Sequence, residues 1–596
     1  MLWLYWYGLK TWFLQDDFAW LGLHLSIYTQ QDFWRALFHP YAQGTVRFLS
    51  ERGFFLLFEY LFGLDALPFR IWVFLTQAAN LVLIAHLTWR LTGSRLAGFL
   101  APLLWMVNNS LGTVMSWTSS YNQSLCAFFL LAGCSLFLRF LETGKKRYYF
   151  AQFVMFLLGF GALELNVVYP ILVAGLAWLV ARRFLVWTVP MFVVSLGYFL
   201  LHRAIAPRQT SGSYALHFDR KIFHTFDTYV HWALGPQRLE LIPWGTEPLR
   251  DAMYILLLVT LLGFLGWQLW KRQWAAGWFV LWFLVVLGPL LPLRDHVSEY
   301  YLTIPTIGLA MLGGWGLAEA TRAGWGWRLL AVLVFVTYTW SNAAMARVAT
   351  RYNFERGRLA KAIVLGVERV LELHPGKIVL LHGIDKDAFY AGVADYPFRL
   401  FRATDIYLTP ESQKNIGLDL ETYWGLALPQ PALVKALRQE RGVVYQLEGD
   451  QLRNVTRLYT AQLAPASSTL SSFVRLGQPL FSDQLGPEWY PIDQGFRWMP
   501  GKATVRLAPL GSVLVARGWV PEQVVQSHPE FTIRVGESTL VRQTLTSSGG
   551  FEVTAKIPDN FRSLPELLIQ LECSKTWVPD GDGRQLCAAF DHIAIR

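Results

Sequence analysis

The 596-residue sequence has few charged residues: Asp, Glu, Lys and Arg together make up 16%, whereas an average soluble domain has about 25%. Its four cysteines show neither zinc-ligand spacing nor the dense disulfide framework of a small secreted domain. The first apolar stretch lacks the small-residue cleavage site of a secretory signal peptide, so we expect no such peptide. These absences exclude a zinc-finger protein, a disulfide-dense module and a chain that is soluble throughout.

Apolar and aromatic residues are abundant instead. The chain is 54% hydrophobic, with 27 Trp and 41 Phe, and its mean hydropathy is +0.31. Nearly all long apolar runs lie within residues 1–346, while residues 347–596 have the composition of a soluble protein. We therefore expect a polytopic α-helical membrane domain at 1–346, a small α/β module at 347–463 and a β-sandwich at 475–596.

A membrane span needs about 20 mostly apolar residues. About eleven runs fit, at 2–14, 68–89, 96–113, 121–140, 148–163, 165–181, 184–201, 252–270, 275–291, 300–319 and 327–346. The first run is short and carries Lys10, which a start of the protein upstream of residue 1 would explain. The fifth and sixth runs are also short, so the predicted number is open by one or two.

Basic residues define the orientation of these spans. With a cytoplasmic N-terminus, every inside turn is basic: Arg90 and Arg95; Lys145, Lys146 and Arg147; Arg182 and Arg183; Lys271 and Arg272; Arg322 and Arg328. Because basic loops stay cytoplasmic, residues 15–67, 202–251, 292–299 and everything after 346 are predicted to be extracytoplasmic. Membrane topology thus accounts for the net charge of +10, and no nucleic-acid partner is expected.

The soluble part has two patterns. Residues 350–372 predict an amphipathic helix leaving the membrane, and "GKIVLLHG" predicts a short buried strand of an α/β module. Residues 464–472, "APASSTLSS", predict a linker. After about residue 475, short segments of alternating apolar and polar residues are separated by turn sequences such as "PDGDG", which is typical of an antiparallel β-sandwich.

Cysteines and aromatic residues of this tail allow two readings each. Cys573 and Cys587 lie close in sequence, and an extracytoplasmic location permits a disulfide between them; two free buried thiols are the alternative. Five aromatic residues could stack on sugars, although packing in the core is the commoner role: Trp489, Tyr490, Trp498, Trp519 and Trp577.

Four groups of polar residues fall on the predicted outer face. They are Asp16 with Asp17; Arg47 with Arg52; Glu164; and the loop holding Arg294, Asp295, His296 and Glu299. Each has an ordinary explanation as a water boundary, a lipid-headgroup contact or a solvated loop. Together they offer carboxylates for proton transfer or cation binding, and basic groups for a phosphate, at the membrane surface.

Residues 1–346 resemble the GT-C superfamily of integral-membrane glycosyltransferases. The resemblance is greatest to the branch with the protein O-mannosyltransferases and the aminoarabinose transferase. Asp16 and Asp17 match its acidic pair, Arg47 matches the arginine of its Arg-Pro pair without the proline, and Asn80 closes a run similar to its second long span. No tetratricopeptide repeats, which some members carry, are evident here.

Two further segments carry the resemblance. "LELNVVYP" retains the acid of a Lys-Glu motif as Glu164, with leucine in place of lysine. "SEYYLTIPTIG" resembles a Glu-Arg-Tyr-Leu-Tyr-Leu-Pro motif, in which Glu299 and Tyr301 match and Tyr300 replaces arginine. The two missing basic residues require other groups to hold a donor phosphate.

The resemblance implies a function and a location. The enzyme would transfer a sugar, with inversion, from a polyprenyl-phosphate donor to a protein, lipid or glycan acceptor on the outer side of a bacterial plasma membrane. Asp16 is preferred as general base, with Asp17 in a capping role and Glu164 as the third catalytic acid. No cofactor is required, although a divalent cation, Mg²⁺ or Mn²⁺, is compatible with the scheme.

Residue roles follow from the same resemblance. The donor phosphate would meet basic side chains, and the substrate pocket would include the acid and the two tyrosines of the third motif. The phosphate-binding candidates are Arg47, Arg294, His296, His202 and Arg203, and the pocket candidates are Glu299, Tyr300 and Tyr301.

Three histidines of the outer loop recur every seven residues: His217, His224 and His231. On a helix they would share a face, where headgroup contact is favoured over a metal site. Alternatives to the transferase are a surface-polysaccharide ligase or polymerase using a diphosphate-linked donor, a transporter, and a non-catalytic membrane subunit.

Overall fold

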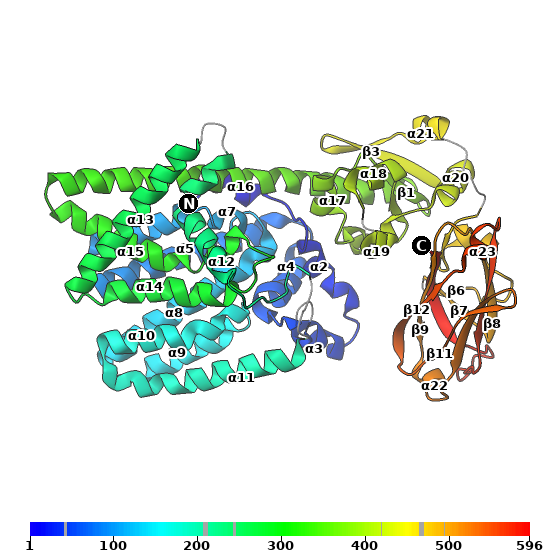
Figure 1. Cartoon of the computed structure of the whole chain (residues 1–596), viewed down its shortest axis with the longest axis horizontal. Helices are drawn as coiled ribbons and strands as arrows, with labels where there is room; N and C mark the ends of the chain where they lie inside the picture. The colour runs from blue at the N-terminus through cyan, green and yellow to red at the C-terminus, as the bar shows by residue number, and fades with distance from the viewer. Residues whose placement is uncertain (41–43, 207–211, 242–245, 419, 464–469, 494) are drawn as a thin grey trace. The chain divides into compact units, whose positions relative to one another are not determined.

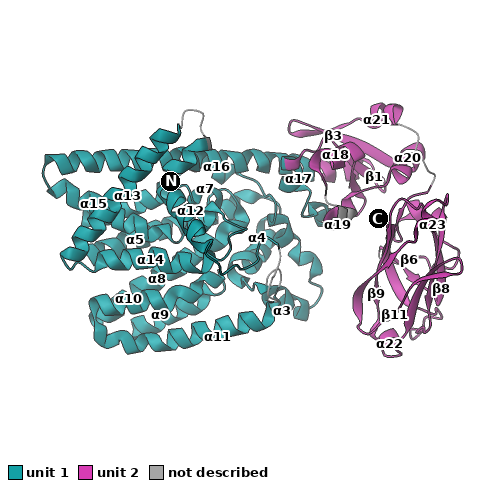
Figure 2. Ribbon diagram, viewed as in Figure 1, with its two compact units in different colours: residues 1–364, 387–402 teal, residues 365–386, 403–596 magenta. Residues whose placement is uncertain are grey.

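A computed structural model of the chain describes residues 1–40, 44–206, 212–241, 246–418, 420–463, 470–493 and 495–596. It divides into two compact units, coloured teal and magenta in Figure 2: residues 1–364 with 387–402, and residues 365–386 with 403–596. Most of the predicted linker 464–472 lies outside the described residues. The predicted domain boundaries at 346 and 463 therefore remain predictions.

The first unit is helical (Figure 1). Its helices are α1 (Trp6–Lys10), α2 (Asp17–Leu21), α3 (Gln30–Phe38), α4 (Phe54–Phe62), α5 (Ala66–Thr92), α6 (Arg95–Val107), α7 (Leu111–Val114), α8 (Tyr121–Thr143), α9 (Lys146–Gly159), α10 (Tyr169–Val180), α11 (Val189–Ile205), α12 (Ile222–Leu234), α13 (Glu247–Trp270), α14 (Ala275–Leu287), α15 (Thr306–Arg322) and α16 (Trp325–Leu373). Five helical segments in the described residues are long and apolar enough to cross a membrane: Ala66–Thr92, Thr118–Thr143, Arg182–Ile205, Glu247–Trp270 and Trp325–Leu373.

The predicted span at residues 2–14 is wrong. Its only helix, α1, has five residues and rises about 7.5 Å, far short of the ~30 Å hydrocarbon core. Tyr5 and Phe13 of this run are fully buried inside the unit, and the Tyr5 hydroxyl donates to the Met106 carbonyl at 2.7 Å. Apolar composition alone does not distinguish a lipid-facing span from a segment that fills the protein interior.

Each of the other ten predicted spans contains an α-helix of at least twelve residues. Several are shorter than a usual span, so the exact number of membrane crossings stays a prediction. The span predicted at 327–346 and the amphipathic helix predicted at 350–372 form one continuous helix, α16, of 49 residues.

Small residues let these helices pack closely. An added Cβ on Gly308 of α15 would lie 2.2 Å from the Phe279 carbonyl oxygen of α14, and one on Gly314 would lie 2.6 Å from the Ala101 nitrogen of α6. Helix α15 therefore contacts both neighbours almost backbone to backbone, as is common where membrane helices associate without a hydrophobic driving force.

Contacts between helix ends connect successive basic turns of the unit. They are an ion pair between Arg90 and Glu142 at 2.5 Å, a hydrogen bond from the Tyr149 hydroxyl to the Trp187 carbonyl at 3.1 Å, and an edge-on ring contact between Trp178 and Trp274 at 5.6 Å. The turns near 90–95, 143–147, 182–188 and 271–274 thus lie at one end of the bundle.

The second unit begins with an α/β module. Its four-stranded sheet has the order β2-β1-β3-β4, with parallel pairs around β1 and an antiparallel pair between β3 and β4. The strands are β1 (Ile378–His382), β2 (Ile406–Leu408), β3 (Gly442–Glu448) and β4 (Gln451–Asn454), and the helices are α18 (Pro410–Ile416), α19 (Leu420–Tyr423), α20 (Gln430–Arg438) and α21 (Thr456–Gln462). Helix α17 (Lys386–Gly392), between β1 and β2 in sequence, falls almost wholly in the segment 387–402 that belongs to the first unit. Strand β1 is the one that "GKIVLLHG" predicts.

Two antiparallel sheets follow. One has the order β11-β10-β13-β8 and the other β12-β9-β14-β7-β6, with β5 also paired to β14. The elements are β5 (Phe473–Arg475), β6 (Ile492–Asp493), β7 (Phe496–Met499), β8 (Lys502–Leu507), β9 (Val513–Val520), α22 (Glu522–Val525), β10 (Glu530–Val535), β11 (Ser538–Thr544), β12 (Gly549–Lys556), α23 (Asp559–Arg562), β13 (Leu567–Cys573) and β14 (Ala588–Ile595).

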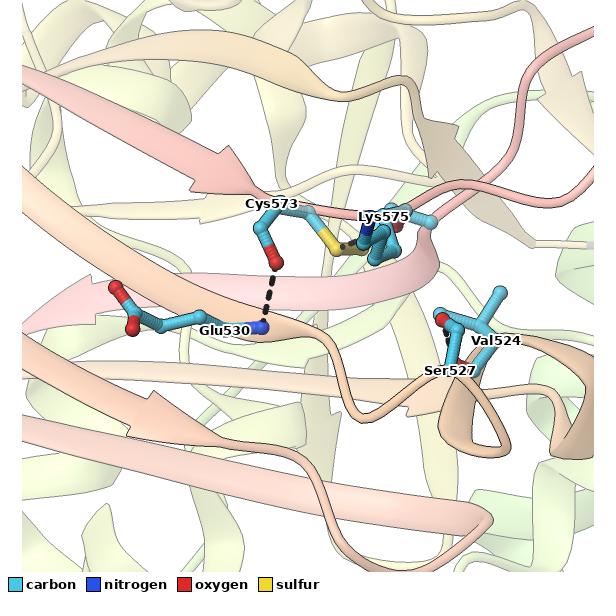
Figure 3. The surroundings of a disulfide bond; sticks show 7 residues. Val524, Ser527, Glu530, Cys573 and Lys575 are labelled. Atoms are coloured by element: carbon cyan, nitrogen blue, oxygen red, sulfur yellow. Dashed lines mark hydrogen bonds between the residues drawn. A yellow bond between two sulfur atoms is a disulfide. The ribbon is translucent and has the colours of Figure 1, made fainter.

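The two sheets share one apolar core. Phe531 of β10 stacks on Phe590 of β14 with ring centroids 5.8 Å apart, and both side chains are fully buried. Cys573 at the end of β13 forms the expected disulfide with Cys587 (Figure 3). The bond ties an end of the four-stranded sheet to the segment entering β14.

Candidate active site

The two adjacent aspartates have different environments. Gln15, just before them, has φ of +55°, and its N–H donates to the Ala391 carbonyl at 3.0 Å. Asp17 is fully buried: it accepts from the Leu14 N–H at 3.0 Å, and from the Ser119 N–H at 2.7 Å and hydroxyl at 2.5 Å. Asp17 therefore ties two loops together.

Asp16 is exposed and starts α2 without capping it through its side chain. Desolvation by the surrounding protein and the negative charge of Asp395 nevertheless raise the pKa of Asp16 to about 6, while Arg47 acts in the opposite direction. A carboxylate that is open to solvent and titrates near neutrality is suited to accept a proton from an incoming group.

Arg47 and Glu164 form an ion pair although they lie far apart in sequence. The Arg47 Nε donates to both Glu164 oxygens, at 3.1 and 2.9 Å, and Nη1 donates to Glu51 at 2.6 Å. Glu51 also accepts from the Asn122 amide at 3.1 Å. Among the residues that the structure describes, no partner engages Nη2 of Arg47, so this N–H pair remains available to a ligand.

Two tyrosines, Tyr214 and Tyr301, belong to the same site, and His296 contacts both of their rings. Tyr214 stacks near His296, with centroids 4.4 Å apart, and His296 meets the Tyr301 ring edge-on at 5.8 Å. Burial, Tyr301 and the Asp16 charge raise the pKa of Tyr214 to about 12. Burial raises the pKa of Tyr301; the Glu164 charge adds to this rise, and the Arg47 charge opposes it. We call Asp16, Arg47, Glu164, Tyr214 and Tyr301 the Asp16 cluster.

Some predicted site residues point elsewhere. Glu299 accepts from Arg238 and from the Asn109 amide at 2.8 Å, so it anchors its loop. Arg294 is paired with Asp219 and lies 3.6 Å from Asp295. Both carboxylates would compete with a donor phosphate for its guanidinium.

The remaining candidates lie beside the cluster. Tyr300 packs on Tyr301 with centroids 4.5 Å apart. His202 stacks on Tyr198 at 6.1 Å. Arg203 is exposed.

The expectation that three histidines share a helical face is wrong. Helix α12 begins at Ile222, so His217 precedes it; its Nε2 lies 2.8 Å from Asp295, and its N–H donates to the Pro292 carbonyl. His231 stacks on Tyr254 at 4.0 Å. Within the described residues, no group of three or more His, Cys, Asp or Glu side chains is placed to hold a metal ion.

Three residues of or near the site escaped the sequence analysis. Glu51 lies between Arg47 and Arg52 in sequence, four residues after Arg47, a helical spacing that could have revealed the pair. Arg70 is fully buried and donates to the Gly8 carbonyl at 2.9 Å; an arginine inside an apolar 27-residue helix is itself a signal. Asp395 carried no sequence signal, because it lies in the segment 387–402, which is far from Asp16 in sequence but belongs to the same compact unit.

Arg52, considered for lipid headgroups, is wholly buried. Its guanidinium donates to three backbone carbonyls, those of Leu37, His39 and Thr45, at 2.6 to 2.8 Å. It therefore shapes the loop that presents Arg47.

No protein-family model and no curated protein sequence matches the chain. Matching solved structures include ArnT from Cupriavidus metallidurans bound to undecaprenyl phosphate, at 11% identity and a TM-score of 0.36, over 78% of this chain and 93% of that one. They also include the arabinosyltransferase EmbB from Mycobacterium smegmatis, at 11% identity and a TM-score of 0.28, over 99% of this chain and 63% of that one. Both are GT-C membrane glycosyltransferases. Because both superpositions are distant, the proposals below depend on this chain's own residues.

Proposed function

We propose that the protein is an inverting membrane glycosyltransferase that uses a polyprenyl-phosphate sugar, with Asp16 as general base. The observation that carries the proposal is the open Asp16 carboxylate, whose pKa is raised to about 6, in one cluster with Arg47. Asp17, the other member of the acidic pair, is committed to three hydrogen bonds. The assignment of the two roles follows from this difference.

The proposed reaction gives separate roles to Asp16, Arg47 and Glu164. Asp16 accepts the proton of an acceptor hydroxyl as its oxygen attacks the anomeric carbon from the side opposite the phosphate. The bond between the anomeric carbon and the phosphate oxygen breaks, and its electron pair leaves with the polyprenyl phosphate. The free Nη2 of Arg47 binds that phosphate, while Glu164 and Glu51 hold the guanidinium in place. Glu164 is thus a positioning residue.

Two observations support an extracytoplasmic site in a plasma membrane. The basic turns lie at one end of the helical unit, as expected of the cytoplasmic end. The disulfide Cys573–Cys587 in the soluble tail fits an oxidising compartment, because such bonds are rare in reducing ones.

The test is transfer in proteoliposomes, with a panel of labelled polyprenyl-phosphate and polyprenyl-diphosphate sugars. We expect a monophosphate donor to be consumed, and Asp16→Asn to lower the rate by about 10²-fold or more. Asp227→Asn, which alters an exposed carboxylate on α12, is the matched control. Undiminished transfer by Asp16→Asn would refute the base assignment. Exclusive use of diphosphate donors would favour a ligase or polymerase, and no transfer at all would favour a non-catalytic subunit or a transporter.

A further inference from the structure

The six-stranded sheet of the second unit has a hollow of about 400 Å³ on the face turned away from the core. Three aromatic rings, two charged side chains and two small residues line it: Phe496, Trp498, Trp519, Arg517, Asp591, Gly518 and Ala589. The volume lies within the ~300–1,000 Å³ typical of small-molecule sites. The hollow uses only strands β7, β9 and β14, so it is separate from the Asp16 cluster.

Strand register explains why the hollow is open. Ala589 of the central strand β14 faces Trp498 of β7 on one side and Trp519 of β9 on the other. The two indoles meet edge to face, with centroids 6.1 Å apart and planes at 83°. The two rings therefore form one continuous aromatic wall, and the small side chain of Ala589, which also lines the hollow, does not fill it. Phe496 stands edge-on to Trp498 at 5.8 Å and extends the aromatic wall.

The charged residues come from the next row of the sheet. The register between β14 and β9 shifts between Phe590 and His592, so Asp591 is the extra residue of a bulge, a device that redirects a side chain. Arg517 is exposed, and no ion pair or hydrogen bond to its guanidinium occurs among the described residues. A cation and an anion thus both line the aromatic hollow.

We propose that this hollow binds a neutral glycan segment. The C–H face of a sugar ring packs on an indole, while its hydroxyls can both donate to Asp591 and accept from Arg517. A purely apolar ligand would leave the Arg517 charge unpaired and would not use Asp591, whose carboxylate lies 3.4 Å from the His592 Nδ1. An anion would meet Asp591, and a cation would meet Arg517. A neutral polyhydroxylated ligand uses every group in the hollow. Of the five aromatic residues considered from sequence, Trp498 and Trp519 belong to this site, whereas Trp489 is buried in the core.

The experiment uses the full chain in lipid nanodiscs, because maltoside and glucoside detergents would themselves supply sugars. Short linear gluco-, manno-, galacto- and arabino-oligosaccharides are the probes, with tryptophan fluorescence and calorimetry as readouts. We expect saturable binding of at least one class and at least about a tenfold weaker affinity for Trp519→Ala. Leu568→Ala, equally exposed at 46% but on the other sheet, should bind as the unaltered protein does.

A second variant keeps the test independent of losing an aromatic residue. Ala589→Leu places a larger side chain in the lining of the hollow and should also abolish binding while the melting temperature is retained. Asp16→Asn should bind the same oligosaccharide unchanged, so failure of the proposed catalysis is distinguishable from failure of this proposal. No binding by any probe, or binding that both hollow variants retain, would overturn the assignment.

Discussion

The Arg47 Nε donates to both carboxylate oxygens of Glu164, at 3.1 and 2.9 Å, although the two residues are 117 positions apart in sequence. The pair joins the residue just before the helical turn Phe48–Gly53 to the start of the short helix Glu164–Val168, which precedes α10. Glu51 holds the other side of the same guanidinium, so the orientation of Arg47 is fixed by two carboxylates. This arrangement explains how an arginine can face a donor phosphate without the lysine and the second arginine that the resemblance to GT-C enzymes implies.

Arg47→Lys is predicted to weaken donor binding. An ammonium is a single point, so it cannot at once reproduce the Nε contact with both Glu164 oxygens, the Nη1 contact with Glu51 and a free N–H pair. We expect the KM for the polyprenyl-phosphate sugar to rise about tenfold or more. Glu164→Gln, which keeps an acceptor oxygen for Nε, should have a smaller effect. An unchanged KM in Arg47→Lys would contradict the phosphate role.

Asp17→Asn is predicted to destabilise the protein. The Asp17 carboxylate accepts three hydrogen bonds, and whichever way the Asn amide turns, its NH₂ group would face a backbone N–H donor. A buried mismatch of this kind costs about 1–3 kcal/mol. Thermal unfolding of the purified protein should show a clear loss for Asp17→Asn and little change for the exposed Asp16→Asn. Equal losses of thermal stability in the two variants would show that the two aspartates do not have different roles.

The pH dependence of transfer should report the ionisation of Asp16. A general base works when deprotonated, so kcat/KM should rise with pH and level off above pH 6, since the Asp16 pKa is about 6. The Asp395 charge raises that pKa, so Asp395→Asn should move the rising limb to lower pH. If the rising part of the pH profile does not move in Asp395→Asn, the group whose ionisation it reports is not Asp16.

The sequence predicted most helices of the first unit well, because long apolar runs indicate helices directly. The prediction failed at residues 2–14, because the apolar residues there, such as Tyr5 and Phe13, are buried inside the protein and do not form a membrane span. Most strands of the tail were predictable from alternation, whereas β11, with its weakly patterned "STLVRQT", was not.

For the site, the sequence indicated Asp16, Arg47 and Glu164, since charges beside apolar runs stand out. It could not indicate that Glu299 accepts hydrogen bonds from Arg238 and Asn109. Nor could it indicate that Asp395 comes beside Asp16 from the segment 387–402, which packs with the first unit. Both depend on tertiary contacts between residues far apart in the chain, and no local pattern carries them.

Removing the disulfide tests the compartment and the fold of the tail together. Cys573 and Cys587 are separated by 14 residues, and closing a loop of this length is worth about 3 kcal/mol in the chain-entropy account. We expect the Cys573→Ser, Cys587→Ser double variant to lower the denaturation midpoint of the tail by a corresponding amount. Buried Cys126 and Cys134 supply the control, since serine there leaves the bridge intact. Alkylation of protein taken from cells without reduction should spare Cys573 and Cys587; labelling of both would place the tail in a reducing compartment and contradict the proposed topology.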